Sequence, residues 1–311
     1  MNKKLLNTLF FSKSGLRLIW PIIAVALLIY VGEVLFVDPF GNLLSKVGLS
    51  EVTGAVAQNW FDSLGDSLKR ILRSIIVVTS ILIVLRFLLK KTYAFIGIDF
   101  QKNRIVELLL GIALGFLVQF ISITLMKSFG WFEVIGFSWN YHSIAFFAPA
   151  ILFTFVFCVE TGIIEEVMFR GFLFNIFENR YSKTIAVIVS SVLFGIVHFS
   201  GFKGEFAWWM SIMSSLAAGF VFAQAFLLFR SLWLPFGLHA GWHFAMRLLG
   251  SVGLSSDEAV FLVTKVEGPA LLVSTKAGGA GLFELIGIMI VSLIMFLMRK
   301  NLMKGSRRIA I

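Results

Sequence analysis

The sequence predicts an all-α fold, a polytopic membrane helical bundle of about eight transmembrane helices. Three observations predict it. The 311 residues are 59% hydrophobic and 14% charged, whereas soluble domains average about 45–50% apolar and about 25% charged residues. The apolar residues are gathered in runs of the length that crosses a bilayer, about 20 residues. Basic residues flank those runs, as the positive-inside rule expects of cytoplasmic loops.

Eight apolar stretches are candidate membrane spans. They cover residues 18–37, 71–89, 105–126, 143–160, 184–200, 208–229, 232–249 and 282–298. One further apolar helix, over about 163–179, lies between the fourth and fifth spans. Residues 160–162 mark the point where it could separate from the fourth span, so 143–179 is either one long tilted helix or two pieces. We expect residues 1–130 to form three N-terminal spans and residues 140–300 to form a second membrane unit.

Basic loops orient the predicted bundle. The segment 86–104 contains Arg86, Lys90, Lys91, Lys102 and Arg104, and further basic residues flank both ends of the chain. With an even number of spans, these loops and both termini face the cytoplasm. Three basic residues fall on the opposite side under this assignment, namely Lys69, Arg70 and Arg73. Basic residues that flank the predicted spans thus account for the net charge of +10. We therefore expect no nucleic-acid partner.

The first apolar run is expected to stay in the membrane. The run 18–37 is longer than the h-region of a signal peptide, about 7–15 residues, and no small-residue cleavage site follows it. We therefore expect an integral, multi-pass protein in a lipid bilayer, and the lack of targeting segments favours a bacterial cell (inner) membrane. The single cysteine, Cys158, excludes a disulfide framework and a cysteine-based metal cluster.

The stretch EEVMFR, residues 165–170, places three ionisable side chains in an apolar helix. Each such group costs about 2.5–3.5 kcal/mol at the middle of a bilayer, which makes it a functional candidate. Glu166 and Arg170 have the i,i+4 spacing of a salt bridge along one helix face. Glu165 has no such partner in the sequence and is therefore the stronger functional candidate.

Three of the four histidines lie in predicted helices downstream of this stretch, at His198, His239 and His243. Glu165 is about 16 residues before the turn near 180–182, and His198 is about 16 residues after it. An antiparallel helical hairpin would bring these two side chains to a similar depth. His239 and His243 are four residues apart, so they share one helix face. The spacing predicts that side chains from three helices converge in one pocket.

Such a pocket could activate a water molecule. A carboxylate in a partly dry site can act as a general base, and a neighbouring histidine can share or relay the proton. Two further imidazoles could donate hydrogen bonds to a developing oxyanion, each contributing about 3–4 kcal/mol. The expected chemistry is amide hydrolysis with no obligatory cofactor. The same acid and three histidines could equally hold Zn²⁺ with an open coordination position.

Three short motifs carry a resemblance to a known family. EEVMFRG (165–171), FGIVH (194–198) and HAGWH (239–243) occur in this order within predicted membrane helices. They resemble the EExxxR, FxxxH and HxxxN motifs of the CPBP family, the CAAX proteases and bacteriocin-processing enzymes also called the Abi family. The similarity covers about residues 140–300, and the earlier spans match only as generic hydrophobic helices.

The resemblance implies an eight-span intramembrane peptidase whose cavity opens toward the cytoplasmic leaflet, with residues 140–300 as its catalytic membrane core. Carried over by position, Glu165 would activate the water with help from His198, and His239 and His243 would form the oxyanion hole. The supporting positions are Glu166, Arg170 and Phe194, the last expected to act by packing. His243 stands where the family usually has Asn, and its ring can replace Asn only if a protonated nitrogen faces the oxyanion.

The leading hypothesis is an intramembrane endopeptidase of the glutamate type that cleaves a peptide, a lipidated protein or a membrane-bound protein. The substrate could be a prenylated C-terminal tail, a leader peptide or a transmembrane segment of a partner. The departure at His243 motivates a second hypothesis, a catalytically silent membrane scaffold or immunity-type interaction protein. A third is a zinc-dependent membrane peptidase. A transporter is less favoured, because the motifs have no inverted-repeat counterpart in the first half of the chain.

Overall fold

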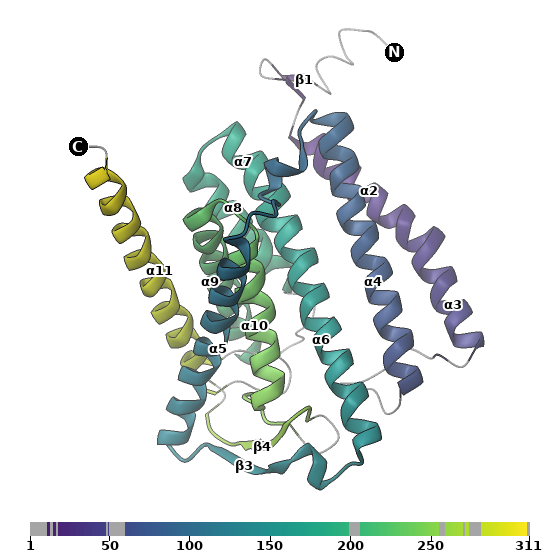
Figure 1. Cartoon of the computed structure of the whole chain (residues 1–311), viewed down its shortest axis with the longest axis vertical. Helices are drawn as coiled ribbons and strands as arrows, with labels where there is room; N and C mark the ends of the chain where they lie inside the picture. The colour runs from purple at the N-terminus through teal and green to yellow at the C-terminus, as the bar shows by residue number, and fades with distance from the viewer. Residues whose placement is uncertain are drawn as a thin grey trace.

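Helices dominate the computed structural model, which is 79% helical, and this confirms the predicted all-α polytopic bundle. It describes residues 11–12, 15–16, 18–47, 49, 60–198, 206–254, 259–269, 271–273 and 281–309. Figure 1 shows long helices that run between two ends of the bundle, and α2 begins at the same end at which α11 finishes.

The helices and strands follow each other in this order. The first half contains β1 (Phe11–Ser12), β2 (Gly15–Leu16), α2 (Ile19–Gly32), η1 (Glu33–Val37), α3 (Asp38–Lys46), α4 (Trp60–Ile83), η2 (Val84–Leu88), η3 (Tyr93–Ile96), α5 (Arg104–Ser128), β3 (Phe132–Phe137) and η4 (Ser138–Asn140). The second half contains α6 (Ile144–Glu166), η5 (Val167–Phe174), α7 (Asn175–Arg180), α8 (Lys183–Val197), α9 (Phe206–Phe229), α10 (Trp233–Leu249), β4 (Leu262–Val266) and α11 (Leu282–Ile309).

Six helical segments of the described chain are long and apolar enough to cross a bilayer. They are Ile19–Lys46, Leu64–Leu88, Arg104–Ser128, Phe147–Arg180, Ile212–Phe229 and Leu282–Asn301. These segments support an integral, multi-pass membrane protein. The two remaining predicted spans coincide with α8 and α10, which have 15 and 17 residues and are shorter than the roughly 20 residues of a bilayer crossing. The count of eight therefore stays a prediction.

The segment that carries EEVMFR is one continuous helix. The elements α6, η5 and α7 follow each other without interruption over residues 144–180, so the chain does not separate at 160–162. The eight residues of η5 are π-helical. The side-chain amide of Asn175 donates to the carbonyl oxygens of Arg170 and Gly171, at 3.1 and 2.7 Å. Such π-helical segments frequently mark functional sites, and this one begins directly after the two glutamates of the motif.

Helices α5 and α10 pack with their backbones in contact. Each carries two glycines four residues apart, Gly111 and Gly115 on α5 and Gly237 and Gly241 on α10. A Cβ atom added at Gly237 would lie 2.2 Å from the carbonyl oxygen of Leu108, so no other residue fits there. Small residues at this spacing let membrane helices approach closely. The contact fixes the position of α10, the helix that carries two of the predicted site residues.

The arginines of α4 are paired with acids inside the bundle. Nε of Arg73 lies 2.7 Å from Glu33 of η1. Arg70 lies 2.5 Å from Asp66 and 3.5 Å from Glu160 of α6. Two of the three basic residues on the unexpected side of the predicted topology, Arg70 and Arg73, are thus accommodated by pairing with carboxylates.

The two loops at the end of the bundle opposite α7 meet as strands (Figure 1). Strands β3 and β4 pair antiparallel, with Phe132 opposite Val266. These strands are not among the elements predicted from the sequence, all of which are helices.

The apolar core lies between η5, α8, α9 and α10. Its largest buried side chains are aromatic, namely Phe169, Phe172, Phe174, Phe222 and Phe226. These buried rings exclude water from the neighbouring charged groups, which strengthens the electrostatic interactions of those groups.

Candidate active site

Glu166 and Arg170 form a buried salt bridge. Nη1 of Arg170 donates to Oε1 of Glu166 at 2.9 Å, and the two side chains are 0% and 1% exposed. This confirms the pairing predicted from their spacing. Buried charges need further hydrogen bonds in addition to each other. Arg170 has one across the helix interface, since its Nη2 donates to the carbonyl oxygen of Gly219 on α9 at 3.0 Å.

Aromatic rings surround the guanidinium of Arg170. Its centre lies 4.5 Å from the ring of Phe194 and 5.0 Å from that of Phe222. Such contacts contribute about 2 kcal/mol each when the cation is removed from water. Phe194 is buried and also packs on His198, with ring centroids 4.7 Å apart. These contacts are consistent with the packing role predicted for Phe194, which stays a prediction.

Glu165 faces two imidazole rings. Its Oε2 lies 3.9 Å from Nε2 of His198 and 3.9 Å from Nε2 of His239. Within the described part of the chain this oxygen accepts no hydrogen bond. A separation of 3.9 Å is longer than a hydrogen bond but short enough for the carboxylate charge to act on both rings. Glu166 differs in that its Oε1 accepts from two donors, whereas its Oε2, like that of Glu165, has no hydrogen-bond partner among the described residues.

His198 is oriented by the helix that carries it. It is the C-cap residue of α8, and its Nδ1 lies 2.8 Å from the carbonyl oxygen of Phe194. Because a carbonyl oxygen only accepts hydrogen bonds, Nδ1 carries the hydrogen of this contact, and Nε2 is the nitrogen that faces Glu165. The side chain is 31% exposed, so the ring is accessible from outside the protein core.

His239 and His243 contact each other on one face of α10, as predicted. Nδ1 of His239 lies 2.8 Å from Oε1 of Glu166, the oxygen that also accepts from Arg170. The Nε2 atoms of the two rings are 3.1 Å apart, so one of them carries the hydrogen between them. Nδ1 of His243 is buried without a hydrogen-bond partner among the described residues.

Two contributions of α9 were not found from the sequence. The carbonyl of Gly219 accepts from Arg170, and the ring of Phe222 stacks on His239 with centroids 4.5 Å apart and planes 14° apart. A Cβ atom at Gly219 would lie 2.9 Å from Cα of Ser191 on α8, so this glycine permits the close approach of α8 and α9. The small residues just before Gly219 were the sole signal in the sequence that α9 contributes to the site. Ordinary helix packing also explains these small residues.

An apolar cavity of about 590 Å³ lies between α5, α6 and α10. Its walls are apolar side chains and Cys158, and they include Phe155 of α6 and Phe236 and Phe244 of α10. Ala240 and Gly241 also line it and directly follow His239 in α10. The cavity therefore borders the same helix turn that contributes imidazoles to the candidate site.

The residues considered for zinc are bonded to one another in the structure. His239 uses Nδ1 toward Glu166 and Nε2 toward His243. Among the residues described, no group of three or more His, Cys, Asp or Glu side chains has the arrangement of a metal site. A zinc ion would thus require these hydrogen bonds to rearrange, and the need for a metal stays an open prediction.

Comparison with known families gives a match over residues 147–245. This region matches the family described as Type II CAAX prenyl endopeptidase Rce1-like, which confirms the resemblance to the CPBP family. All seven predicted site residues, from Glu165 to His243, lie inside the matched region. No match was found among curated proteins. The roles of individual side chains, and the division into units 1–130 and 140–300, stay predictions.

Proposed function

Since residues 147–245 belong to the CAAX protease family, we propose that the chain is an intramembrane endopeptidase in which Glu165 activates water. The observation that carries this proposal is the contrast between the two glutamates of the motif. Glu166 accepts from Arg170 and His239, so its charge is already compensated. Glu165 instead faces two imidazoles at 3.9 Å, and among the described residues its Oε2 accepts no hydrogen bond.

The proposed reaction uses the carboxylate twice. Glu165 takes a proton from the water as its oxygen attacks the scissile carbonyl carbon. His198 orients the same water, because Nε2 of its neutral ring accepts the second hydrogen. When the C–N bond breaks, the proton on Glu165 passes to the leaving amine, and the carboxylate is regenerated. The buried Glu166–Arg170 pair supports this step by holding His239 in place.

The oxyanion is proposed to be stabilised from α10. The proposed donor is the hydrogen between the Nε2 atoms of His239 and His243. The ring that carries it must turn toward the substrate carbonyl, or gain a second proton, to donate to the oxyanion. A correctly placed donor of this kind contributes about 3–4 kcal/mol to catalysis. At position 243 the family usually has an Asn amide, whereas this chain has an imidazole, whose N–H must reorient before it can donate to the oxyanion.

The apolar cavity supports a lipidated or membrane-embedded substrate. Its volume of about 590 Å³ is within the range of small-molecule and cofactor sites, and its apolar walls suit hydrocarbon. We propose that the apolar part of a peptide or membrane-associated protein lies there while its backbone reaches Glu165. Under the positive-inside rule, the basic loop 86–104 and both termini would face the cytoplasm, and a bacterial inner membrane is the proposed location.

A cleavage assay tests the proposed function. The full-length protein in liposomes is incubated with prenylated tails, leader peptides and transmembrane segments, and products are identified by mass spectrometry. At least one class should be cleaved, and Glu165→Gln should lower the rate by about 10²–10⁴-fold because it removes the proton acceptor at constant volume. Cleavage by Glu165→Gln at the wild-type rate would rule out the mechanism.

Two alternatives have separate tests. His243 in place of Asn favours a catalytically silent scaffold or immunity-type protein, which would cleave no substrate and would keep its biological role in Glu165→Gln. The acid and three histidines favour a zinc peptidase, which would purify with stoichiometric metal. Its activity would be lost with a chelator and restored by Zn²⁺.

A further inference from the structure

A cluster of four buried polar side chains ties α10 to α5 and α11. Its members are Gln119 of α5, Trp242 of α10, Ser251 just after α10 and Glu284 of α11, and each is at most 8% exposed. Nε1 of Trp242 and Nε2 of Gln119 both donate to Oε1 of Glu284 at 2.7 Å. Oγ of Ser251 donates to Oε1 of Gln119 at 2.6 Å. This group, the Glu284 cluster, thus joins three helices, one of which carries two imidazoles of the candidate site.

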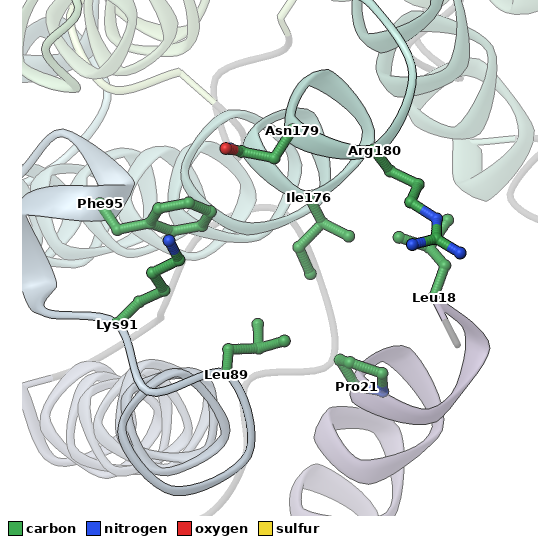
Figure 2. Close-up of a pocket in the computed structure, with 8 residues that line it drawn as sticks. All are labelled: Leu18, Pro21, Leu89, Lys91, Phe95, Ile176, Asn179 and Arg180. Atoms are coloured by element: carbon green, nitrogen blue, oxygen red, sulfur yellow. The ribbon is translucent and has the colours of Figure 1, made fainter. Parts of the chain in front are cut away.

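A polar side chain that lines the cavity in Figure 2 is bonded differently. This cavity, of about 300 Å³, lies where α2 begins and α7 ends. Asn179, in its lining, donates from Nδ2 to the carbonyl oxygen of Asn175 on the same helix at 2.7 Å. Such a bond stabilises a single helix. The hydrogen bonds of the Glu284 cluster instead connect separate helices, so they can fix the position of α10 relative to its neighbours.

The glycine contact between α5 and α10 sets the distance between these helices. A Cβ atom added at Gly241 would lie 2.7 Å from Cα of Ile112, and one added at Gly115 would meet the backbone nitrogen of Trp242. Dispersion contacts of this kind are individually weak and do not select one direction. A hydrogen bond has a preferred length and angle. The bond from Trp242 to Glu284 therefore fixes what the glycines leave open, the rotation of α10 about its own axis.

Glu284 is held in place for this bond by the packing of α11. A Cβ atom added at Gly287, about one turn further along α11, would lie 2.7 Å from the carbonyl oxygen of Val118. Val118 directly precedes Gln119, the other donor to Glu284. Helices α5 and α11 thus touch beside the carboxylate, which gives the indole of Trp242 an acceptor in a fixed position.

Trp242 lies beside the imidazoles of the candidate site. Its ring is 6.0 Å from that of Phe222, measured between centroids, and Phe222 stacks on His239 at 4.5 Å. His243 follows Trp242 directly in the chain. Successive side chains of an α-helix leave its axis about 100° apart, so a fixed direction of the indole also fixes the direction in which His243 leaves α10.

We propose that Glu284 and Trp242 are positioning residues for the candidate active site. The carboxylate of Glu284 holds the indole of Trp242. The indole in turn sets the direction of His243 and, through Phe222, the place of the His239 ring. Both residues act through the imidazoles and are not proposed to touch the substrate. The effect on cleavage rests on the proposed function, whereas the positions of the rings are measured without a substrate.

The positions of the rings are measured by magic-angle spinning NMR of the full-length protein in liposomes. The chain has four histidines, so labelling histidine alone with a nitrogen isotope gives few imidazole signals, which His239→Gln and His243→Gln assign. Trp242→Phe keeps an apolar ring and removes the donor to Glu284. It should shift the imidazole signals of His239 and His243 and leave that of His142 unchanged.

The rate of cleavage gives a second measurement, with a conservative variant as the rescue. Glu284→Leu has no acceptor for the indole and should lower kcat about tenfold, the factor expected from the loss of one buried hydrogen bond, with KM unchanged. Glu284→Gln retains an oxygen that can accept from Trp242 and should keep kcat within about threefold of the wild type. Equal losses in both variants would attribute the effect to the charge and would overturn the positioning role.

Ser292→Ala is the matched control. It removes another hydrogen bond of α11, from Oγ of Ser292 to Oε1 of Gln224 on α9 at 2.7 Å, and this bond does not involve α10. It should leave the histidine signals and kcat unchanged. Unchanged signals of His239 and His243 in Trp242→Phe, or equal shifts in Ser292→Ala, would overturn the proposal.

The two measurements separate this proposal from the proposed function. A wild type that cleaves no substrate would contradict the proposed function, and the NMR comparison would still decide whether Trp242 positions the rings. Shifted signals together with a wild-type kcat would overturn the role in the reaction. Should Trp242→Phe not fold, Trp242→Phe/Glu284→Gln removes the charge together with the donor and makes the same test.

Discussion

Two groups of charged side chains inside the bundle differ in how their carboxylates are paired. The N-terminal group consists of Glu33, Asp66, Arg70, Arg73 and Glu160, and each of its acids has an arginine within 4 Å. The motif group consists of Glu165, Glu166, Arg170, His198 and His239. Its single arginine is bonded to Glu166, and the second carboxylate faces imidazoles.

This difference in pairing distinguishes carboxylates that stabilise the fold from the carboxylate proposed to take part in the reaction. A carboxylate bonded to arginine is stabilised in its ionised form and is a poor proton acceptor. A carboxylate that faces imidazoles instead of an arginine can exchange protons with them. Helix α6 carries a carboxylate with an arginine partner, Glu160, and one that faces imidazoles, Glu165, within two turns of one another. We therefore expect that removing the charge of Glu160 lowers stability, whereas removing the charge of Glu165 lowers cleavage.

The largest effect on stability is expected from Arg170→Leu. This change leaves the buried charge of Glu166 without its partner, and the loss of one member of a buried pair costs about 3–5 kcal/mol. Chemical denaturation in detergent measures the change in the free energy of unfolding. Arg230→Gln, which breaks the more exposed pair with Glu178, should cost about 1 kcal/mol or less. Equal stabilities of the two variants would contradict a structural role for the buried pair.

The charge of the buried pair is tested by a double substitution. Glu166→Leu/Arg170→Leu removes both charges and should recover part of the stability lost in Arg170→Leu, because no uncompensated charge remains. If the double variant is less stable than Arg170→Leu, packing rather than charge compensation dominates at this position.

His198→Ala should lower the cleavage rate by about 10²–10⁴-fold, because it removes the ring that orients the water beside Glu165. The melting temperature should change little, since the ring is 31% exposed. Val192→Ala on the same helix, at an exposed position, is the matched control and should cleave at the wild-type rate. Similar rates for both variants would remove His198 from the mechanism.

A smaller effect is expected at position 243. His243→Asn should keep the cleavage rate within about tenfold of the wild type, because an amide N–H can replace the imidazole as a donor. His243→Phe has no donor and should lose about 10²–10³-fold. A wild-type rate in His243→Phe would show that the oxyanion is stabilised elsewhere.

The smallest effect concerns Asp99, which lies outside the spanning helices and pairs with Arg104 at the start of α5. Nε of Arg104 donates to Asp99 at 2.6 Å, and this hydrogen bond lowers the pKa of the Asp99 carboxyl from its ordinary value. A lowered pKa gives stability that is present above about pH 4 and is lost as the pH falls through the folded value. Asp99→Asn should therefore cost below about 1 kcal/mol at neutral pH. The difference from wild type should shrink in acid, and a difference independent of pH would contradict the pairing.

The sequence predicted the parts of the site that follow from spacing along one helix or one hairpin. The i,i+4 rule predicted the contact of Glu166 with Arg170 and that of His239 with His243. The hairpin between α7 and α8 predicted that Glu165 meets His198. These contacts depend on local helix geometry, which a sequence specifies directly.

The contacts between non-consecutive helices could not be predicted in this way. Helix α9 is apolar on all sides, so periodicity does not say which of its faces is buried. The stacking of Phe222 on His239 and the carbonyl of Gly219 beside Arg170 therefore required the structure. The pairing of β3 with β4 was missed because its strands come from loops far apart in the sequence.

The most direct test of the account compares Glu165→Gln with Glu160→Gln, two isosteric changes on helix α6. Cleavage rate and melting temperature are measured for both in the same liposomes. We predict that Glu165→Gln loses cleavage by about 10²–10⁴-fold and keeps its stability, whereas Glu160→Gln keeps cleavage and loses stability. Normal cleavage by Glu165→Gln, or an equal loss of cleavage in both variants, would contradict the central claim that the carboxylate without an arginine partner performs the chemistry.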